Sequence, residues 1–281
     1  TRFITIEEGK PPENFKRNTY QECVRQIMED CDQAMKKLPD TYTGDDAIVG
    51  IENTGRATSL AAAVLKSRVA LYSASPAFQS SKIVTLNHGA DYSIADQEAY
   101  QKQWEYAALI SNAVLLLDGF GSYTPLTASN LADAPTTTPA DFVFRNYYNT
   151  NGMETNHFPP FYRGAAHTVP SQNLVDAFPA IDGYPIGVSK QYDPDFPYAN
   201  RDKRLDLNVY YQGRQFGDNS TSIDVVAGGK DSKEFHHQAS RTGYYLAKFM
   251  SKKKDMLTPT QMLSAIHYNP LLRKSEVFLN F

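Results

Sequence analysis

Three stretches in the first part of the chain carry apolar residues at intervals of three and four, which is the period of an amphipathic helix. They cover residues 20–38, 58–75 and 97–117. Thr19 and Glu22 have the spacing of a capping box, in which each side chain bonds the backbone N–H of the other residue. The pattern therefore predicts three helices of similar length, the first of which begins directly after Thr19.

The second predicted helix is rich in alanine and apolar on more than one side, so we expect it to lie between neighbours. Three helices with small residues at their contacts are typical of a helical-hairpin repeat array. The segments 40–56 and 79–96 interrupt a strict repeat. We therefore expect a mainly α protein in which residues 1–118 form a divergent, tetratricopeptide-like array.

The character of the sequence changes after this array. Residues 119–250 are rich in Pro, Gly, Asn, Asp and Tyr, and strand-like pieces occur only at 205–211 and 222–226. A stretch of this length without regular structure is uncommon unless it is functional, and its many Tyr and Phe residues exclude simple disorder. We expect an ordered, loop-rich excursion packed on the helices, after which residues 251–281 return to the helical part of one integrated domain.

Composition narrows the possible functions. The net charge is -3 over 281 residues, so there is no basic field that would bind nucleic acid or an anionic membrane. The longest apolar run, 107–117, is too short to span a bilayer. Cys23 and Cys31 lie ~12 Å apart along the first predicted helix, beyond the ~7 Å limit of a disulfide. We expect both to be buried free thiols.

Catalytic and cofactor motifs are missing from the sequence. The segment 228–232 lacks the spacing of a phosphate-binding loop, and no nucleophile elbow occurs. His236 and His237 are adjacent and point in different directions on a helix or a strand, so they make a poor metal pair. Asp193 and Asp195 are the best candidates for paired acids in glycan hydrolysis, although their Pro-rich context favours a turn. The sequence predicts no cofactor, no metal and no catalysis.

A second line of argument comes from six short segments that are distributed over nearly the whole chain. Each is a weak signal alone, and their order makes the set specific. They are Gly55-Arg56-Ala57-Thr58 with the helix up to Ala74-Ser75-Pro76, Trp104-Glu105-Tyr106-Ala107-Ala108, Pro170-Ser171-Gln172-Asn173-Leu174-Val175-Asp176-Ala177-Phe178-Pro179 with Asp182-Gly183, Asn200-Arg201-Asp202-Lys203-Arg204-Leu205, Gly243-Tyr244-Tyr245 with Lys248-Phe249, and Arg273 with Glu276-Val277-Phe278-Leu279-Asn280.

In this order the segments resemble the motifs of the SusD/RagB family of nutrient-binding outer-membrane lipoproteins. The resemblance implies a non-catalytic protein, lipid-anchored at the cell surface of a Gram-negative bacterium, that binds oligosaccharides for a SusC-like TonB-dependent transporter. Some branches of the family bind peptides instead. Family members are considerably longer, so we expect the portion with the lipidated Cys, and later helices, to lie outside this chain, which leaves it no membrane contact of its own.

The motif residues themselves are expected to be structural. Their residue types suit charge-assisted hydrogen bonds and tight turns that hold a scaffold together. The set consists of Arg56, Asp176, Asp182, Gly183, Arg201, Asp202 and Arg204.

Ligand contact is expected from an aromatic stretch outside the motifs. Tyr147, Tyr148 and Tyr162 are predicted stacking platforms for sugar rings, because a tyrosine offers a flat apolar face and a hydroxyl together. Polar contacts are expected from the other side chains. The complete predicted set is Tyr147, Tyr148, Asn149, Asn151, His157, Phe161, Tyr162 and Arg163. Two readings compete with glycan capture: a glycan-acting enzyme that uses Asp193 or Asp195, and a helical-repeat adaptor that binds only protein.

Overall fold

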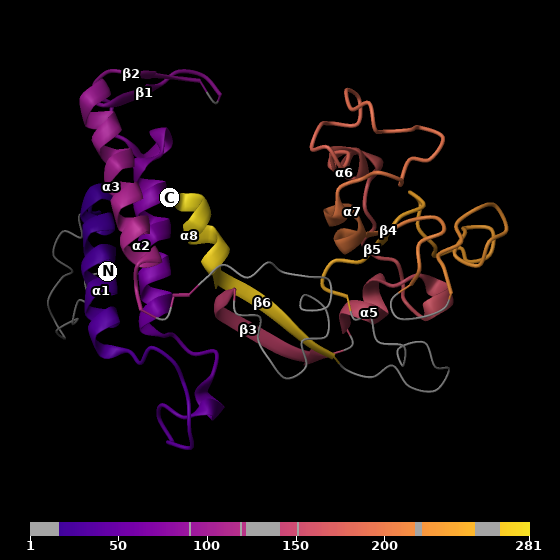
Figure 1. Cartoon of the computed structure of the whole chain (residues 1–281), viewed down its shortest axis with the longest axis horizontal. Helices are drawn as coiled ribbons and strands as arrows, with labels where there is room; N and C mark the ends of the chain where they lie inside the picture. Colours follow the sequence, from indigo (N-terminus) through magenta and orange to yellow (C-terminus); the bar gives the residue numbers. More distant parts are fainter. Residues whose placement is uncertain are drawn as a thin grey trace, which may run out of the picture. The chain divides into compact units, whose positions relative to one another are not determined.

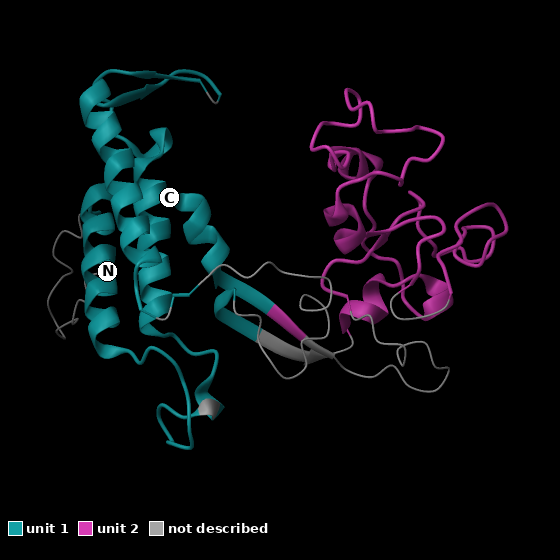
Figure 2. Cartoon of the chain, in the orientation of Figure 1, with its two compact units in different colours: residues 1–125, 140–146, 269–281 teal, residues 126–139, 147–268 magenta. Residues whose placement is uncertain are grey.

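The protein consists of two compact units, which Figure 2 shows in different colours. The helical unit comprises residues 1–125, 140–146 and 269–281, and the loop-rich unit comprises residues 126–139 and 147–268. The architecture comes from a computed structural model. It describes residues 17–89, 91–118, 120–121, 141–150, 152–216, 221–250 and 265–281, with the side chains of 51, 147–150, 265 and 266 excepted.

The helical unit is built on three long helices that lie side by side in Figure 1. They are α1 (Tyr20–Lys37), α2 (Ser59–Ala74) and α3 (Gln97–Leu115). Helix α2 packs against both α1 and α3, and the short helix α8 (Lys274–Asn280) packs against α2 and α3. The prediction of a mainly α, tetratricopeptide-like array is confirmed, as is the prediction that the alanine-rich helix is enclosed by neighbours.

Each long helix begins at a side-chain cap. The capping box is present: Thr19 Oγ1 accepts from the Glu22 N–H at 3.2 Å, and a Glu22 carboxylate oxygen accepts from the Thr19 N–H at 2.8 Å. Thr58 caps α2 and Asp96 caps α3 in the same way. Such caps supply acceptors for N–H groups that have no partner inside the helix.

Small residues bring these helices close together. Ser67 and Ser111 are fully buried where α2 meets α3, and their hydroxyls share a hydrogen bond of 2.9 Å. The Ser111 hydroxyl also lies 2.9 Å from the Ala107 carbonyl oxygen. The Asn280 amide of α8 donates to Ser67 at 3.0 Å. The surrounding apolar core consists of two clusters, one of Ala61, Ala63, Val64, Val114, Phe120, Leu272 and Val277, and the other of Met28, Ala70, Ala74 and Ala107.

Short elements fill the segments between the long helices. The 3₁₀ turn η1 covers Ile51–Asn53, and η2 covers Pro76–Phe78 directly after α2. Strands β1 (Val84–Leu86) and β2 (Tyr92–Ile94) form an antiparallel hairpin before α3. The sequence did not predict this hairpin, because each strand has only three residues and no extended alternation.

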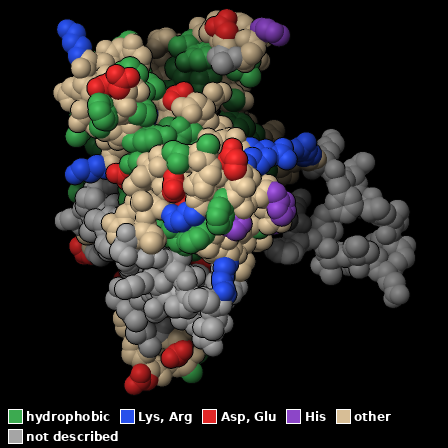
Figure 3. Space-filling view, turned by 90° about the vertical axis from the view of Figure 1, so that its right-hand side faces the viewer, with side chains coloured by type: hydrophobic (Ala, Val, Ile, Leu, Met, Phe, Trp, Pro, Cys, Tyr) green, Lys and Arg blue, Asp and Glu red, His purple; other side chains and the backbone are tan. Residues whose placement is uncertain are grey.

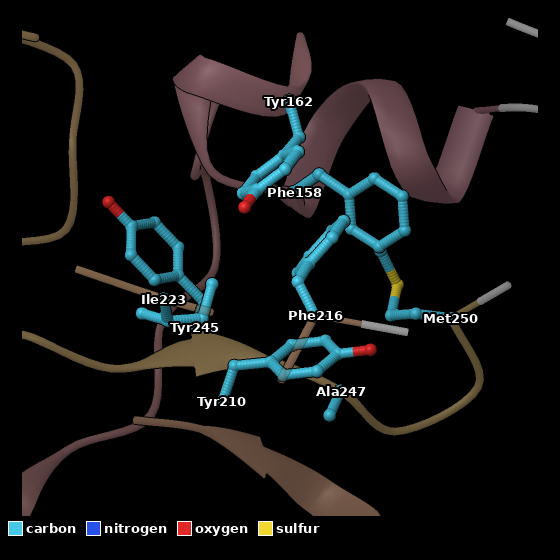
Figure 4. Packing of buried hydrophobic residues seen from close by; sticks show 8 residues of the cluster. All are labelled: Phe158, Tyr162, Tyr210, Phe216, Ile223, Tyr245, Ala247 and Met250. Carbon is cyan, nitrogen blue, oxygen red and sulfur yellow. The ribbon is translucent and has the colours of Figure 1, made fainter. Parts of the chain in front are cut away.

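The loop-rich unit has only short elements. Its strands β4 and β5 pair antiparallel, with Val209 opposite Leu246 and Tyr210 opposite Tyr245. Its largest core is an aromatic cluster (Figure 4) of Phe158, Tyr162, Tyr210, Phe216, Ile223, Tyr245, Ala247 and Met250. The elements are α5 (Gly152–His157), η3 (Pro160–Tyr162), α6 (Gln172–Ala177), α7 (Lys203–Asn208), β4 (Val209–Tyr210) and β5 (Tyr245–Leu246).

The strand predicted at residues 205–211 is wrong for most of its length. Residues 203–208 form α7, and only Val209 and Tyr210 are strand. Leu205 and Val209 are both buried and pack with Val175 and Tyr244. Residues four positions apart lie on the same side of a helix and also on the same side of a strand, so this spacing did not distinguish the two structures. The predicted strand at 222–226 is reduced to a single bridge between Gln215 and Ser222.

The longest strands are β3 (Phe142–Thr150) and β6 (Ala265–Arg273), which pair in a two-stranded sheet (Figure 1). Both strands cross the boundary between the units: residues 142–146 and 269–273 belong to the helical unit, and residues 147–150 and 265–268 belong to the loop-rich unit. The sequence did not predict either strand. Pro270 in the middle of β6 argues against a central strand, but a sheet of two strands has only edges, where proline is tolerated.

The two cysteines are unpaired, but they differ in exposure. Cys31 is buried, as predicted, whereas Cys23 is exposed on the solvent side of α1. The prediction of two buried thiols is therefore wrong for Cys23. Cys23 lies in the first turn of α1, and the buried residues of this helix, Met28 and Cys31, come later in it.

Candidate ligand-binding surface of the loop-rich unit

The predicted ligand residues fall partly in the described region. Tyr147, Tyr148 and Asn149 belong to β3, but their side chains are outside the described part of the structure. Asn151 is outside the described residues altogether. The structure therefore tests the positions of His157 in α5, Phe161 and Tyr162 in η3, and Arg163 directly after it.

Tyr162 belongs to the core of the unit. Only 4% of its surface is exposed, and its ring stacks on Phe216 with centroids 3.9 Å apart (Figure 4). Its hydroxyl is 3.0 Å from the Thr221 hydroxyl. A ring buried in this way offers no free face to a ligand, so the structure contradicts the prediction of Tyr162 as a stacking platform. Composition alone cannot separate a tyrosine that packs inside a loop-rich unit from one that is displayed on it.

Phe161 and Arg163, on either side of Tyr162, are exposed. The Phe161 ring meets the Tyr162 ring edge-on at 5.2 Å, which fixes its orientation. Arg163 has a left-handed backbone with φ 66°, a conformation that costs a non-glycine residue of order 1–3 kcal/mol. Gly164 follows because a Cβ there would lie 2.0 Å from the Phe158 carbonyl oxygen. This tight turn pushes Phe161 and Arg163 outward while Tyr162 stays inside.

The charged pair of Lys230 and Asp231 packs against the turn of residues 161–163. Lys230 Nζ lies 5.4 Å from the Phe161 ring centroid and 5.3 Å from that of Tyr162, within the range of cation–π attraction. It also donates to an Asp231 carboxylate oxygen at 3.1 Å and to the Ser222 carbonyl. Burial raises the pKa of Asp231, while the Asp224 N–H and Lys230 oppose that increase. Lys230 therefore positions the turn rather than reaching outward from it.

His157 lies next to this region and is half-buried. Burial, and then the nearby His167, lower the pKa of the His157 imidazole, while Glu154 opposes the shift. The neutral ring can donate one hydrogen bond and accept one. Its Nδ1 has no hydrogen-bond partner within the described part of the chain. His157 is a neutral polar group beside the exposed turn.

Most of the motif residues are seen in structural contacts. The Arg201 guanidinium, 7% exposed, donates to the carbonyls of Pro197 at 2.8 Å, Val175 at 2.5 Å and Phe178 at 2.8 Å. It thereby binds the end of α6 to the loop before α7. Its planar fork also lies 5.5 Å from the ring centroid of Tyr192. An arginine suits this role because its donors are rigidly arranged and always charged.

The other motif residues act locally. Asp202 caps α7 by accepting from the Arg204 N–H at 2.8 Å, and it also pairs with the Arg204 side chain at 2.7 Å. Asp182 accepts from the Tyr184 N–H and the Ser189 hydroxyl at 3.1 and 2.8 Å. Gly183 has φ 82°, which favours glycine. Asp176 accepts from Gln172 on the surface of α6 at 2.7 Å, and Arg56 is exposed.

These contacts hold a loop that displays large apolar side chains. In the loop of residues 178–201, Tyr184 is 62% exposed and Phe196 is 67% exposed, and Ile181 and Val188 are also open to solvent. The ends of the loop are tied by a bridge between Ala180 and Arg201. We did not predict Tyr184 or Phe196 as ligand residues. The available signal was that both lie between two motif segments, so that a fixed backbone displays them.

Asp193 and Asp195 have the geometry of a turn. The Asp193 carboxylate accepts from the Asp195 N–H at 2.9 Å, and the Asp193 carbonyl accepts from the Phe196 N–H at 3.1 Å. Both residues are exposed. This agrees with turn chemistry at Asp-Pro-Asp-Phe, in which an aspartate bonds its own backbone two residues on.

On the face shown in Figure 3, hydrophobic side chains lie among basic, acidic and histidine side chains. Among the described residues, no cluster of His, Cys, Asp and Glu has a geometry that could hold a metal ion. No helix in the described ranges combines the length and the apolar character that crossing a membrane requires.

The fold and these contacts together define a class: a tetratricopeptide-like helical array that carries a loop-rich unit held by a buried arginine. The model of the SusD family matches residues 138–281, which is just over half of the chain. The chain belongs to this family. No curated protein matches the chain at the level of sequence.

Solved structures from Bacteroides share the fold. One is described as a SusD-like carbohydrate binding protein from Bacteroides fragilis NCTC 9343, with a TM-score of 0.61, 21% identity, and coverage of 94% of this chain and 45% of that protein. Another SusD-like protein from the same strain has a TM-score of 0.63 and 23% identity, with coverage of 96% of this chain and 50% of that protein. A SusD superfamily protein from Bacteroides vulgatus ATCC 8482 has a TM-score of 0.52 and 14% identity, with coverage of 92% of this chain and 44% of that protein. The chain thus spans about half the length of these proteins.

Proposed function

We propose that this protein binds an oligosaccharide at the cell surface and delivers it to a SusC-like TonB-dependent transporter in the outer membrane, without catalysing a reaction. The observation that carries the proposal is the display of exposed aromatic side chains by a fixed loop. Tyr184 and Phe196 are exposed, and Arg201 holds the loop of residues 178–201 that carries both of them. Membership in the SusD family supports the same function, as does the fold shared with a protein described as carbohydrate binding.

The physical chemistry of sugars fits such a surface. A pyranose ring has apolar C–H faces that pack against an aromatic ring, and hydroxyls that need hydrogen-bonding partners around that ring. In the turn of residues 161–163, Phe161 supplies an apolar ring and Arg163 a polar contact. In the loop of residues 178–201, Phe196 supplies an apolar ring and Tyr184 a ring with a hydroxyl. The loop backbone is ordered before binding, which limits the entropy lost when a ligand is immobilised.

Within this proposal the two units divide the work. The helical unit provides a broad surface for docking on the transporter, and the loop-rich unit contacts the ligand. Outer-membrane localisation through a lipid anchor belongs to the same proposal and rests on family membership. Of the predicted ligand residues, His157, Phe161 and Arg163 remain candidates beside Tyr184 and Phe196. The predicted residues outside the described part of the structure also remain candidates, and they are Tyr147, Tyr148, Asn149 and Asn151.

A binding screen tests the proposal. The purified chain is titrated by calorimetry with a panel of oligosaccharides and a panel of peptides of matched length. The expected result is binding of at least one oligosaccharide, with its composition unchanged afterwards by chromatography. Binding of peptides alone would place the protein in a peptide-binding branch. Shortened oligosaccharides would instead indicate an enzyme, and the variant D193N/D195N would then show whether these carboxylates are responsible.

The display residues give the sharper version of the test. The double variant Tyr184→Ala/Phe196→Ala should lose at least about tenfold in affinity, because stacking on an aromatic ring contributes ~0.5–1.5 kcal/mol beyond area burial. The control is Val188→Ala, which shortens an exposed apolar side chain of the same loop without removing a ring. Equal affinity of the double variant and the control would remove Tyr184 and Phe196 from the site.

A further inference from the structure

A groove on the helical unit has the properties of a ligand site. It is formed by α1, α2, α3 and the turn after α2, and its volume is about 390 Å³. Its lining follows α1 from Tyr20 to Asp32, which corresponds to ~18 Å of helix length. Val24 and Met28 are its aliphatic lining residues, and Met28 packs beneath the surface against the buried residues Ala70, Ala74 and Ala107. The groove lies entirely within the helical unit.

Aromatic rings border this groove. Tyr20 and Phe78 stack on each other in parallel, with centroids 4.8 Å apart and an interplanar angle of 8°. Each is more than a third exposed, and Tyr106 on α3 is exposed as well. Stacking holds the first two rings in one orientation, so their exposed edges and outer faces are presented without further loss of side-chain freedom.

Amide groups project into the groove without partners of their own. Gln21 on α1 and Gln103 on α3 make no hydrogen bond within the described part of the chain. Gln79 donates through its side-chain nitrogen to the Ser73 carbonyl, which leaves its side-chain oxygen available as an acceptor. Lys66 donates to Asp32 at 2.6 Å and has two further N–H donors. Donors and acceptors thus converge on the groove from all three helices.

The charges along the groove cancel. Arg25 and Lys66 are balanced by Glu29 and Asp32, so the groove offers no net attraction to an anion or a cation. Peptides that bind in grooves are usually recognised through apolar pockets for anchoring side chains. Of the side chains that line this groove, only Val24 and Met28 are aliphatic, and eight are polar or charged. Planar amides, aromatic rings and a balanced charge instead suit a neutral, hydroxyl-rich chain.

We propose that this groove is a second carbohydrate site, which binds a neutral, extended stretch of an oligosaccharide along α1. The inference rests on the proposed function, because it assumes that the physiological ligand is a glycan. It adds to it a site on the helical unit, distinct from the exposed rings of the loop-rich unit. In this arrangement Gln21 and Gln103 bond sugar hydroxyls from opposite walls, and the Tyr20, Phe78 and Tyr106 rings contact the C–H faces.

The experiment uses the full chain and four defined probes: the β-1,4-linked hexasaccharides of glucose, mannose and xylose, and the α-1,4-linked hexasaccharide of glucose. Affinity is measured by calorimetry for the wild type and for Gln21→Leu/Gln103→Leu. The matched control is Gln26→Leu/Gln101→Leu, which makes the same changes on the same helices outside the groove, where the amides bond Asp30 and Glu105. Circular dichroism melts verify that both variants fold as the wild type does.

The expected result is a loss of at least about tenfold in affinity, or of one binding equivalent, in the groove variant but not in the control, because two hydrogen bonds of ~1 kcal/mol each are removed. Wild-type behaviour of the groove variant toward every hexasaccharide that the wild type binds overturns the second site alone. Failure of the wild type to bind any of the four overturns the site for neutral glycans and counts against the proposed function too. Loss of peptide binding in the groove variant, with no glycan bound, would overturn it in favour of a peptide groove.

Discussion

The two units of this protein are stabilised in different ways. The helical unit has three helices of 16–19 residues whose buried alanines and serines form continuous contacts. The loop-rich unit has no described helix longer than six residues, and long-range contacts from single polar residues such as Arg201 hold it together. We therefore expect the stability of the helical unit to be distributed over many small contacts. We expect that of the loop-rich unit to depend on its aromatic core and on a few polar residues that hold its loops.

This difference is measurable because the chain has a single tryptophan, Trp104, which lies in α3. Its fluorescence reports on the helical unit. The near-ultraviolet circular dichroism of tyrosines such as Tyr162, Tyr210 and Tyr245, which are buried in the aromatic cluster, reports mainly on the loop-rich unit. Four predictions, in order of decreasing expected effect, test this difference between the two units.

The largest effect is expected for Arg201→Met. It leaves three carbonyl oxygens without their charged donor, and hydrogen bonds to charged groups contribute ~1.5–3 kcal/mol each. Urea unfolding followed by tyrosine circular dichroism should show a loss of ~3 kcal/mol or more, while the Trp104 transition moves much less. Arg204→Met, which removes an exposed arginine of the same motif, is the control and should change little. Equal effects of the two variants would contradict concentration of stability at Arg201.

The second prediction concerns Ala70→Leu in the helical unit. Ala70 is fully buried, and a larger side chain there should separate α2 from its neighbours at a cost of ~1–3 kcal/mol. The Trp104 transition should shift to lower urea concentration. Ala113→Leu, at an exposed position of α3, provides the comparison and should stay within ~0.5 kcal/mol of the wild type. A fully tolerated leucine at position 70 would show that α2 is less closely packed than its alanines indicate.

The third prediction compares the caps of the two units. Asp202→Ala removes the cap of α7 and should destabilise the loop-rich unit by ~1 kcal/mol. Thr19→Ala removes one half of the α1 capping box and should lower the stability of the helical unit by a similar amount. Asp202→Asn keeps a capping oxygen, so it separates the cap from the ion pair with Arg204. A loss in Asp202→Asn as large as that in Asp202→Ala would identify the ion pair as the important contact.

The smallest effect is a dependence on pH. Because burial lowers the pKa of His157, the unfolded chain binds a proton more readily than the folded protein. The contribution to stability is complete above the ordinary imidazole pKa of ~6.5. It is lost as the pH falls toward the lowered value. The free energy of unfolding should therefore decrease between about pH 7.5 and about pH 5.5, and His157→Asn should reduce that decrease. His88→Asn, at an exposed residue of the helical unit, should leave it unchanged.

The same contrast explains which parts of the fold could be predicted. The three helices of the array are specified by periodicity, caps and a proline, all of which are local in sequence, and the structure confirms them. The start of α8 was also found, through its motif residues. Strand β6 was missed because Pro270 is acceptable in an edge strand but not in a central one. Whether a strand lies at the edge of a sheet depends on its partners and not on its own sequence.

The candidate site was less predictable for a physical reason. Phe161 and Tyr162 are adjacent aromatic residues, yet Tyr162 is buried and Phe161 is exposed. Their different exposure results from the left-handed turn at Arg163 and from the position of Lys230, which lies nearly seventy residues later in the sequence. Tyr184 and Phe196 became candidates only when the contacts of Arg201 showed that their loop is fixed. Exposure of an aromatic residue in irregular structure depends on contacts that no short window contains.

The pairing of β3 with β6 has an evolutionary consequence. The main part of the loop-rich unit, residues 147–268, begins in one strand of this small sheet and ends in the adjacent one. Insertions are tolerated best where the two ends of the inserted piece lie close together. The loops can therefore be lengthened, shortened or exchanged without altering the ends that the helices require. A lineage could in this way acquire new ligands while keeping the same helical frame.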